Sequence, residues 1–175
     1  MLDNELFAHI RTELKERLAA FTQYDLSDVK VKRSYQPTQQ NTGDDRLVVI
    51  HRISNPQVGG GIVYNGTNRV EQKFKRATFQ FDSLAPIIPS DETALTANDI
   101  LTISADLLQS YSSIRNLREK GVNIERVTDV RPSYFINDKS RFESSPSFDL
   151  TVNYQHDYEN ETPSVEGVTG NYYGE

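Results

Sequence analysis

The last strand-like segment of this chain constrains its fold more than any other feature. Phe148, Leu150, Val152 and Tyr154 alternate with polar residues without a break. Because successive side chains of a β-strand point to opposite faces of a sheet, the pattern predicts a strand with one buried and one polar face. A sheet of such strands needs a covering layer, so the rest of the chain must supply one.

Two amphipathic helices can form this layer. The first is predicted from Asp3 to Ala20, with Asp3 as its N-cap and apolar residues spaced by three and four. The second starts at a capping box made by Thr96 and Asp99 and ends before Gly121. Its expected apolar stripe consists of Ile100, Ile103, Leu107, Tyr111 and Ile114, widened by Leu101 and Leu108. We expect a kink or break near Ser112, and we place Ile103, Leu107 and Phe148 at the contact between helix and sheet.

The remaining strands follow from short β-branched or alternating runs. They are predicted at Val29–Tyr35, Leu47–Ile53, Val70–Phe81 and Val122–Val130. The element order predicts one α+β domain, residues 1–156, with a mostly antiparallel sheet of four to five strands and two main helices packed on one face.

A long arm is predicted between the second and third strands, from Ser54 to Arg69. Three turn signals fall there: Asn55-Pro56, Gly59-Gly60-Gly61 and Asn65-Gly66. We interpret the segment as a flexible β-hairpin arm with a small hairpin around residues 62–64. A connection of this length inside a small domain usually has a function.

Charge is concentrated at the end of the chain. The net charge is −6, and five acidic residues lie beyond the last predicted strand with no Lys or Arg among them. Residues 157–175 are therefore predicted to be a flexible acidic tail that orders only when something binds it. The acidic balance also argues against a protein that wraps nucleic acid. A basic run at Arg69, Lys73, Lys75 and Arg76 is expected to meet carboxylates of a partner or of a neighbouring copy more readily than DNA.

Composition and motifs exclude several chemistries. The chain has no Cys, and its three His residues, His9, His51 and His156, form no metal-ligand motif. Gly59-Gly60-Gly61 lacks the Lys-Ser/Thr ending of a phosphate-binding loop, and no Gly-x-Ser-x-Gly elbow occurs. The charged first twenty residues resemble neither a signal peptide nor a membrane span, so no membrane partner is expected. We predict no cofactor, no metal site and no catalytic residue.

One enzymatic alternative stays open. Asp45, Glu71 and Lys73 have the order of a magnesium-dependent nuclease site, in which two carboxylates hold the metal and a Lys assists cleavage. Alternation places Glu71 and Lys73 on the same face as Ala77 and Phe79, so such a site would interrupt a core face.

The C-terminal strand pair resembles that of a known family. Val127–Arg131, Lys139–Glu143 and Phe148–Leu150, together with the element order over Asp3–Tyr154, are similar to tail-terminator-like neck and tail-completion proteins of tailed bacteriophages. The resemblance implies a structural virion protein, not an enzyme. Its copies would form a homo-oligomeric ring, expected to be a hexamer, that terminates the tail tube or joins tail to head.

The resemblance also implies the partners and the place of assembly. Other neck, connector and tail tube proteins would bind the ring, and DNA would pass through it without specific binding. Assembly would occur in the cytoplasm of the host bacterium. Long polar segments suit contacts between subunits, so the candidate interface residues are Gly59, Gly60, Gly61, Tyr64, Arg131, Asp138, Lys139, Arg141, Phe142, Tyr172 and Tyr173.

Overall fold

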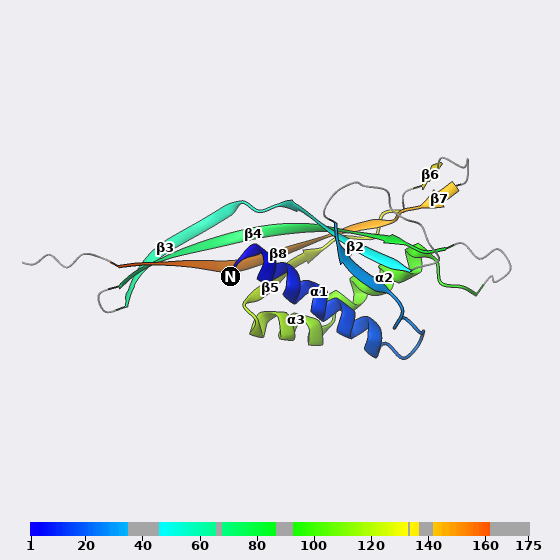
Figure 1. Cartoon of the computed structure of the whole chain (residues 1–175), viewed down its shortest axis with the longest axis horizontal. Helices are drawn as coiled ribbons and strands as arrows, with labels where there is room; N and C mark the ends of the chain where they lie inside the picture. The colour runs from blue at the N-terminus through cyan, green and yellow to red at the C-terminus, as the bar shows by residue number, and fades with distance from the viewer. Residues whose placement is uncertain (35–45, 66–67, 87–92, 133, 137–141, 162–175) are drawn as a thin grey trace, which may run out of the picture.

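The fold is a single twisted sheet with helices on one face (Figure 1). The computed structural model describes the whole chain except residues 35–45, 66–67, 87–92, 133, 137–141 and 162–175. Six strands form the sheet in the order β1-β2-β4-β8-β5, and β3 also pairs with β4. These strands are β1 (Lys30–Arg33), β2 (Leu47–Ser54), β3 (Gln57–Asn65), β4 (Asn68–Leu84), β5 (Val122–Val127) and β8 (Ser147–Glu161). Two short strands, β6 (Tyr134–Ile136) and β7 (Phe142–Ser144), pair with each other in a separate sheet.

The predicted fold class is confirmed. Within the main sheet the pairing is antiparallel except between β1 and β2. The sheet has six strands rather than four to five because Gln57–Asn65, predicted as part of a flexible β-hairpin arm, is one regular strand that pairs with β4 as a long hairpin. Asn55 and Pro56 separate β2 from β3, and both strands follow the same edge of β4.

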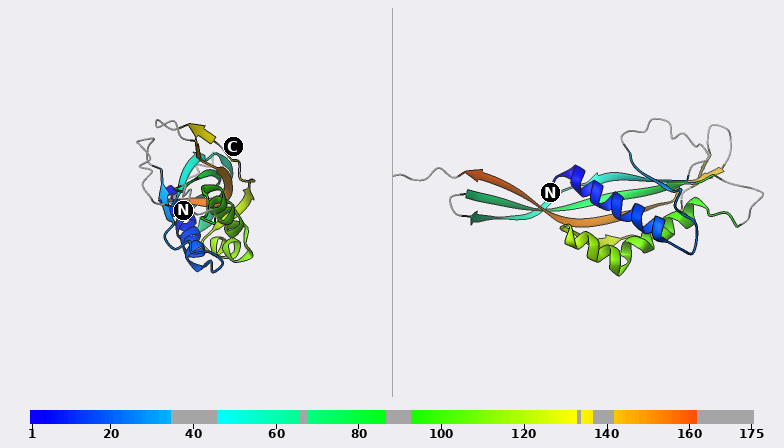
Figure 2. Two further views of the ribbon diagram at one scale, coloured as in Figure 1. Left: turned by 90° about the vertical axis from the view of Figure 1, so that its right-hand side faces the viewer. Right: turned by 60° about the horizontal axis from the view of Figure 1, so that its bottom comes forward.

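In the described ranges three helices are present, and they cover one face of the sheet (Figure 2). They are α1 (Asp3–Ala20), α2 (Ala97–Gln109) and α3 (Tyr111–Glu119). The break between α2 and α3 falls at Ser110, close to the predicted kink, and the Ser110 hydroxyl caps α3 by accepting the Ser113 N–H at 3.3 Å. Gly121 follows α3 with φ 77°, a left-handed conformation that favours glycine at a helix end.

The core lies between this helical layer and the sheet. Phe81 and Phe148 stack with their ring centroids 4.7 Å apart, and both are fully buried. Burial of each such aromatic side chain stabilises the fold by about 1.5–3 kcal/mol. The opposite face of the sheet is polar: His51 contacts Asp82 at 2.8 Å, and Thr78 meets Thr151 across β4 and β8 at 3.4 Å.

The buried side of α2 differs from the predicted stripe. Ile103 and Leu107 are only half-buried, and Tyr111 is 79% exposed. The buried residues of α2 are Ala97, Ile100, Leu101, Ser104, Ala105 and Leu108. The helix turns its small residues inward because α1 packs beside it, and the Ser104 hydroxyl is satisfied by donating to the Ile100 carbonyl at 2.7 Å.

Two predicted boundaries also change. Asp3 is the first residue of α1 rather than its cap, since Leu2 is the N-cap and the Glu5 carboxylate accepts the Leu2 N–H at 2.7 Å. At the other end, β8 continues to Glu161, so residues 157–161 of the predicted tail pair with β4. The backbone of β4 supplies hydrogen bonds there that a free tail would lack. The tail residues 162–175 lie outside the described residues.

Candidate assembly interface

The distal halves of β4 and β8, with β3, form a three-stranded arm that extends beyond the helices (Figure 1). The arm exists because β4 runs unbroken for 17 residues and β8 for 15. In the arm, β3 pairs with β4 from Gln57↔Lys75 to Asn65↔Asn68, and β8 pairs on the other side of β4 out to Asn68↔Glu161. No helix among the described residues packs on this part of the sheet.

One face of the arm carries charged and aromatic side chains in register. The pairs Lys75↔Tyr154, Lys73↔His156 and Glu71↔Tyr158 continue the row that begins with Phe81↔Phe148 in the core. The Lys73 ammonium lies 4.6 Å from the centroid of the Tyr158 ring, and the His156 ring meets Tyr158 edge-on at 4.2 Å. The charged row therefore has aromatic partners within the arm.

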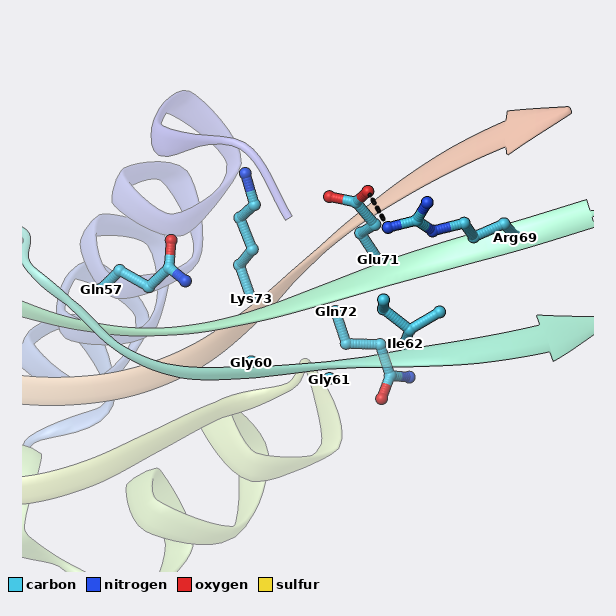
Figure 3. Close-up of a pocket in the computed structure, with 8 residues that line it drawn as sticks. All are labelled: Gln57, Gly60, Gly61, Ile62, Arg69, Glu71, Gln72 and Lys73. Atoms are coloured by element: carbon cyan, nitrogen blue, oxygen red, sulfur yellow. Dashed lines mark ion pairs between the residues drawn. The ribbon is translucent and has the colours of Figure 1, made fainter. Parts of the chain in front are cut away.

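An open hollow on this face lies between β3 and β4 (Figure 3). It lies where Gly60 pairs with Lys73 and Gly61 pairs with Gln72, and neither glycine contributes a side chain. Lys73, Glu71 and Arg69 project from β4 beside it, and Arg69 contacts Glu71 at 3.0 Å. The described part of the chain contains no cluster of three or more His, Asp or Glu residues able to hold a metal ion.

Apolar side chains are exposed on both faces of the arm. Of the ten large apolar residues that are exposed in the described part of the chain, six lie on the arm, each 44–66% exposed: Val58, Ile62, Val63, Tyr64, Phe74 and Tyr158. By register, Ile62 and Tyr64 share the face of Glu71, whereas Val63 and Phe74 lie on the opposite face. Exposed apolar groups gathered on an uncovered element mark a contact surface more often than a solvent-exposed one.

A polar cluster joins the root of the arm to α1. The Asn55 amide donates to the Tyr154 hydroxyl at 2.9 Å and to the Asp3 carboxylate at 3.2 Å, and Arg52 forms an ion pair with Asp3. The hydrogen bond from Arg52 lowers the pKa of Asp3 below its ordinary value of 3.8, and burial raises the pKa of Tyr154 above 10.0. These bonds tie β2, β8 and α1 together where the arm leaves the body.

The first residue of the chain also contacts the root. The Met1 amino group donates to the Gln155 carbonyl at 3.3 Å, and the Met1 carbonyl lies 2.6 Å from Nδ1 of His156. The direction of the arm is thus set by contacts from both ends of the domain.

The predicted interface residues fall in separate places. Gly60 and Gly61 line the hollow, Gly59 packs against Phe74 in the same arm, and Tyr64 lies near the outer end of β3. Arg131 is exposed and pairs with Asp149 at 2.9 Å. Phe142 belongs to β7, which lies at the opposite end of the molecule from the arm tip (Figure 1). Asp138, Lys139, Arg141, Tyr172 and Tyr173 lie outside the described residues.

Sequence reasoning ended the last strand at His156 and missed its continuation. Tyr158 extends the alternation of Tyr154 and His156 two residues past that predicted end. The polar cluster at the root left no such signal, because its members come from three distant segments.

The nuclease arrangement does not assemble among the described residues. Glu71 is paired with Arg69, and Lys73 lies over Tyr158. Asp45, the third member of the predicted set, lies outside the described residues.

No helix in the described ranges is both long and apolar enough to span a bilayer.

Comparison with known proteins gives two findings. Residues 5–164 match the family model described as E217 gateway protein gp29. Among solved structures, the chain is similar to the sheath/tube terminator of an extracellular contractile injection system, PVC, in its extended state. The TM-score is 0.52 at 9% identity, and the similarity covers 100% of this chain and 64% of that one. At this identity the likeness concerns the fold, and no curated protein matches the chain.

Proposed function

Because the chain belongs to the E217 gateway protein gp29 family, we propose that it is a structural protein of the phage neck whose copies close into a ring. The family match and the fold shared with a tube terminator confirm the resemblance to tail-terminator-like phage proteins. The ring, its expected hexameric state and its position, at the end of the tail tube or between tail and head, are the proposal.

The observation that carries the proposal is the uncovered arm. A three-stranded sheet with apolar groups exposed on both faces gains little stability from itself. Contact with another subunit would bury Tyr64, Phe74 and Tyr158 and remove their apolar surface from water. Repeated, head-to-tail contacts of this kind close into a ring when the rotation between copies allows it.

Further partners follow from the same reading. The ring binds other neck, connector and tail tube proteins, and β6 and β7 offer a second contact region far from the arm (Figure 1). With its acidic balance the ring lets DNA pass without gripping it. The protein is then a virion component, assembled in the host cytoplasm.

Native mass spectrometry of the full chain tests the proposal. A closed ring gives one dominant species at an integral multiple of 19.9 kDa, and electron micrographs of it show rings with a central hole. A protein that stays monomeric at high concentration, even after purified tail tube protein is added, contradicts the ring.

Catalysis is not part of the proposal, because no observation favours the nuclease. We expect supercoiled DNA to remain intact during incubation with the protein and Mg²⁺ or Mn²⁺, as judged by gel electrophoresis. Cleavage that disappears in Glu71→Ala would show that the pairing of Glu71 with Arg69 does not prevent metal chemistry.

A further inference from the structure

The outer edge of β3 is open. Among the described strands β3 pairs only with β4, so the backbone groups along its other side have no strand partner. Natural sheets protect such edges with charges, prolines or bulges. Between Gln57 and Asn65 there is no charged residue and no proline, and the register shift between Gln57 and Gly59 affects only the beginning of the strand.

The edge strands of the body are protected. β1 carries Lys30, Lys32 and Arg33, and β5 has a register shift between Ile124 and Arg126 together with Glu125 and Arg126. Charges and a register shift protect the edge strands of the body against pairing with another strand, and β3 lacks them over most of its length. The β3 edge is therefore suited to accept another strand.

The arm has a second edge of opposite character. Pairing of β5 with β8 ends at Tyr154, so β8 from Asp157 to Glu161 has a described partner only on the β4 side. The alternate positions 157, 159 and 161 are all acidic, and by register position 159 lies opposite Val70. Val63 also lies opposite Val70, so Val63 shares a face of the sheet with these acidic positions.

We propose that the β3 edge of one copy pairs with the 157–161 edge of β8 in the next copy, joining the arms into one continuous sheet. The inference rests on the proposed ring and specifies its interface. Pairing two β8 edges would set acidic rows against each other, which is unfavourable. Pairing two β3 edges would be isologous and would stop at a dimer, whereas pairing β3 with β8 is heterologous and can repeat around a ring.

Strand direction is compatible with this choice. Both β3 and β8 run antiparallel to β4 and therefore parallel to each other. If the arms lie along the ring axis, rotation from one copy to the next leaves the strand direction unchanged. The β3 strand of one copy and the β8 strand of the next copy then pair in parallel.

Charge substitution at Val63 tests the proposal. Val63→Glu places a carboxylate on the same sheet face as acidic positions 157, 159 and 161 of the neighbouring copy. We therefore expect the dissociation constant of the ring to rise about ten-fold or more. Added salt should partly reverse this increase. Val63→Lys should assemble as well as the unmodified chain. The matched control is Tyr111→Glu, at a residue of α3 that is 79% exposed and distant from the arm, and it should leave assembly unchanged.

The outcomes separate the inference from the function on which it rests. Equal weakening by Val63→Glu and Val63→Lys would indicate pairing of two β3 edges, and no effect of either would place the β3 edge outside the interface. Both results overturn the inference while leaving a ring. An unmodified chain that forms no ring overturns the proposed function.

Zero-length coupling gives an independent readout. A carbodiimide joins a Lys to a carboxylate that it touches, so the amine introduced by Val63→Lys should couple to residue 157, 159 or 161. Mixed rings of isotope-labelled and unlabelled copies distinguish links between copies from links within one. If the peptide that carries the Val63→Lys substitution couples only within its own chain, or only to the body of a neighbour, the proposed pairing is contradicted.

Discussion

At the scale of single residues, Glu13 is the clearest example of an ionisable side chain whose burial depends on the charged groups around it. Its side chain is fully buried where α1 meets α3, and the carboxylate contacts Nε of Arg17 at 2.8 Å and Nζ of Lys120 at 4.0 Å. A buried carboxylate is tolerated when charged or polar donors surround it, and removal of a donor leaves it uncompensated.

We therefore expect Arg17→Ala to lower the free energy of unfolding by about 1.5–3 kcal/mol, measured by urea denaturation. Arg115→Ala is the control, because Arg115 also has a glutamate partner four residues on, Glu119, but both side chains are more than 60% exposed. The control should change stability by less than about 0.5 kcal/mol. Equal effects of the two substitutions would show that burial of Glu13 does not decide the cost.

At the scale of elements, the facing of α2 decides which leucine holds it to the sheet. Leu108 is fully buried, whereas its neighbour Leu107 is half-buried. Leu108→Ala should therefore lower the free energy of unfolding by about 2–5 kcal/mol. Leu107→Ala, the same chemical change one residue away, should cost clearly less in the same urea titration. A larger loss at Leu107 would mean that α2 is rotated toward the stripe predicted from sequence.

The glycines of β3 offer a second matched pair. A Cβ added at Gly60 would lie 2.7 Å from the Gln72 carbonyl oxygen, whereas a Cβ at Gly61 meets nothing within 4 Å. Gly60→Ala should thus force β3 away from β4, and Gly61→Ala should be neutral or slightly stabilising.

Hydrogen exchange measures this effect locally. In Gly60→Ala, amides of β3 and the adjoining part of β4 should exchange faster, while amides of the core strand segment around Phe148 keep their protection. Unchanged exchange in the arm would show that the backbone absorbs the added methyl group.

At the scale of the whole molecule, a compact body and an extended arm share the two longest strands. β4 and β8 pass from the core, where Phe81 pairs with Phe148, into the arm, where Glu71 pairs with Tyr158 (Figure 2). The arm and the core therefore belong to one continuous sheet. The cluster of Asp3, Asn55 and Tyr154 lies at the point of transition.

Two truncations separate the arm from the tail. Removal of residues 162–175 should leave the melting temperature nearly unchanged, because these residues lie beyond the last strand. It should weaken the binding of this chain to neighbouring copies or other neck proteins, because it removes acidic groups. Removal from Asp157 onward also deletes five residues paired with β4, so it should expose the arm and increase its hydrogen exchange. If the protein no longer folds when only residues 162–175 are removed, these residues belong to the domain.

Local patterns in the sequence determined the class of fold. The alternation of Phe148, Leu150, Val152 and Tyr154 requires a half-buried strand whatever its neighbours are, and the periodicity of Leu6, Ile10 and Leu14 requires an amphipathic helix. The helix break at Ser110 and the stop at Gly121 also depend on nearby residues, so they were close to prediction.

Tertiary structure alone decided the features that involve distant partners. Burial of Glu13 depends on Arg17 together with Lys120, and the facing of α2 depends on how α1 packs beside it. The strand character of Gly59–Gly61, and of residues 159–161 past the end of the alternation at Tyr158, comes from the edges that β4 offers on its two sides. Pairing of this kind overrides weak local propensity, because each backbone hydrogen bond in the arm needs a partner from elsewhere in the chain.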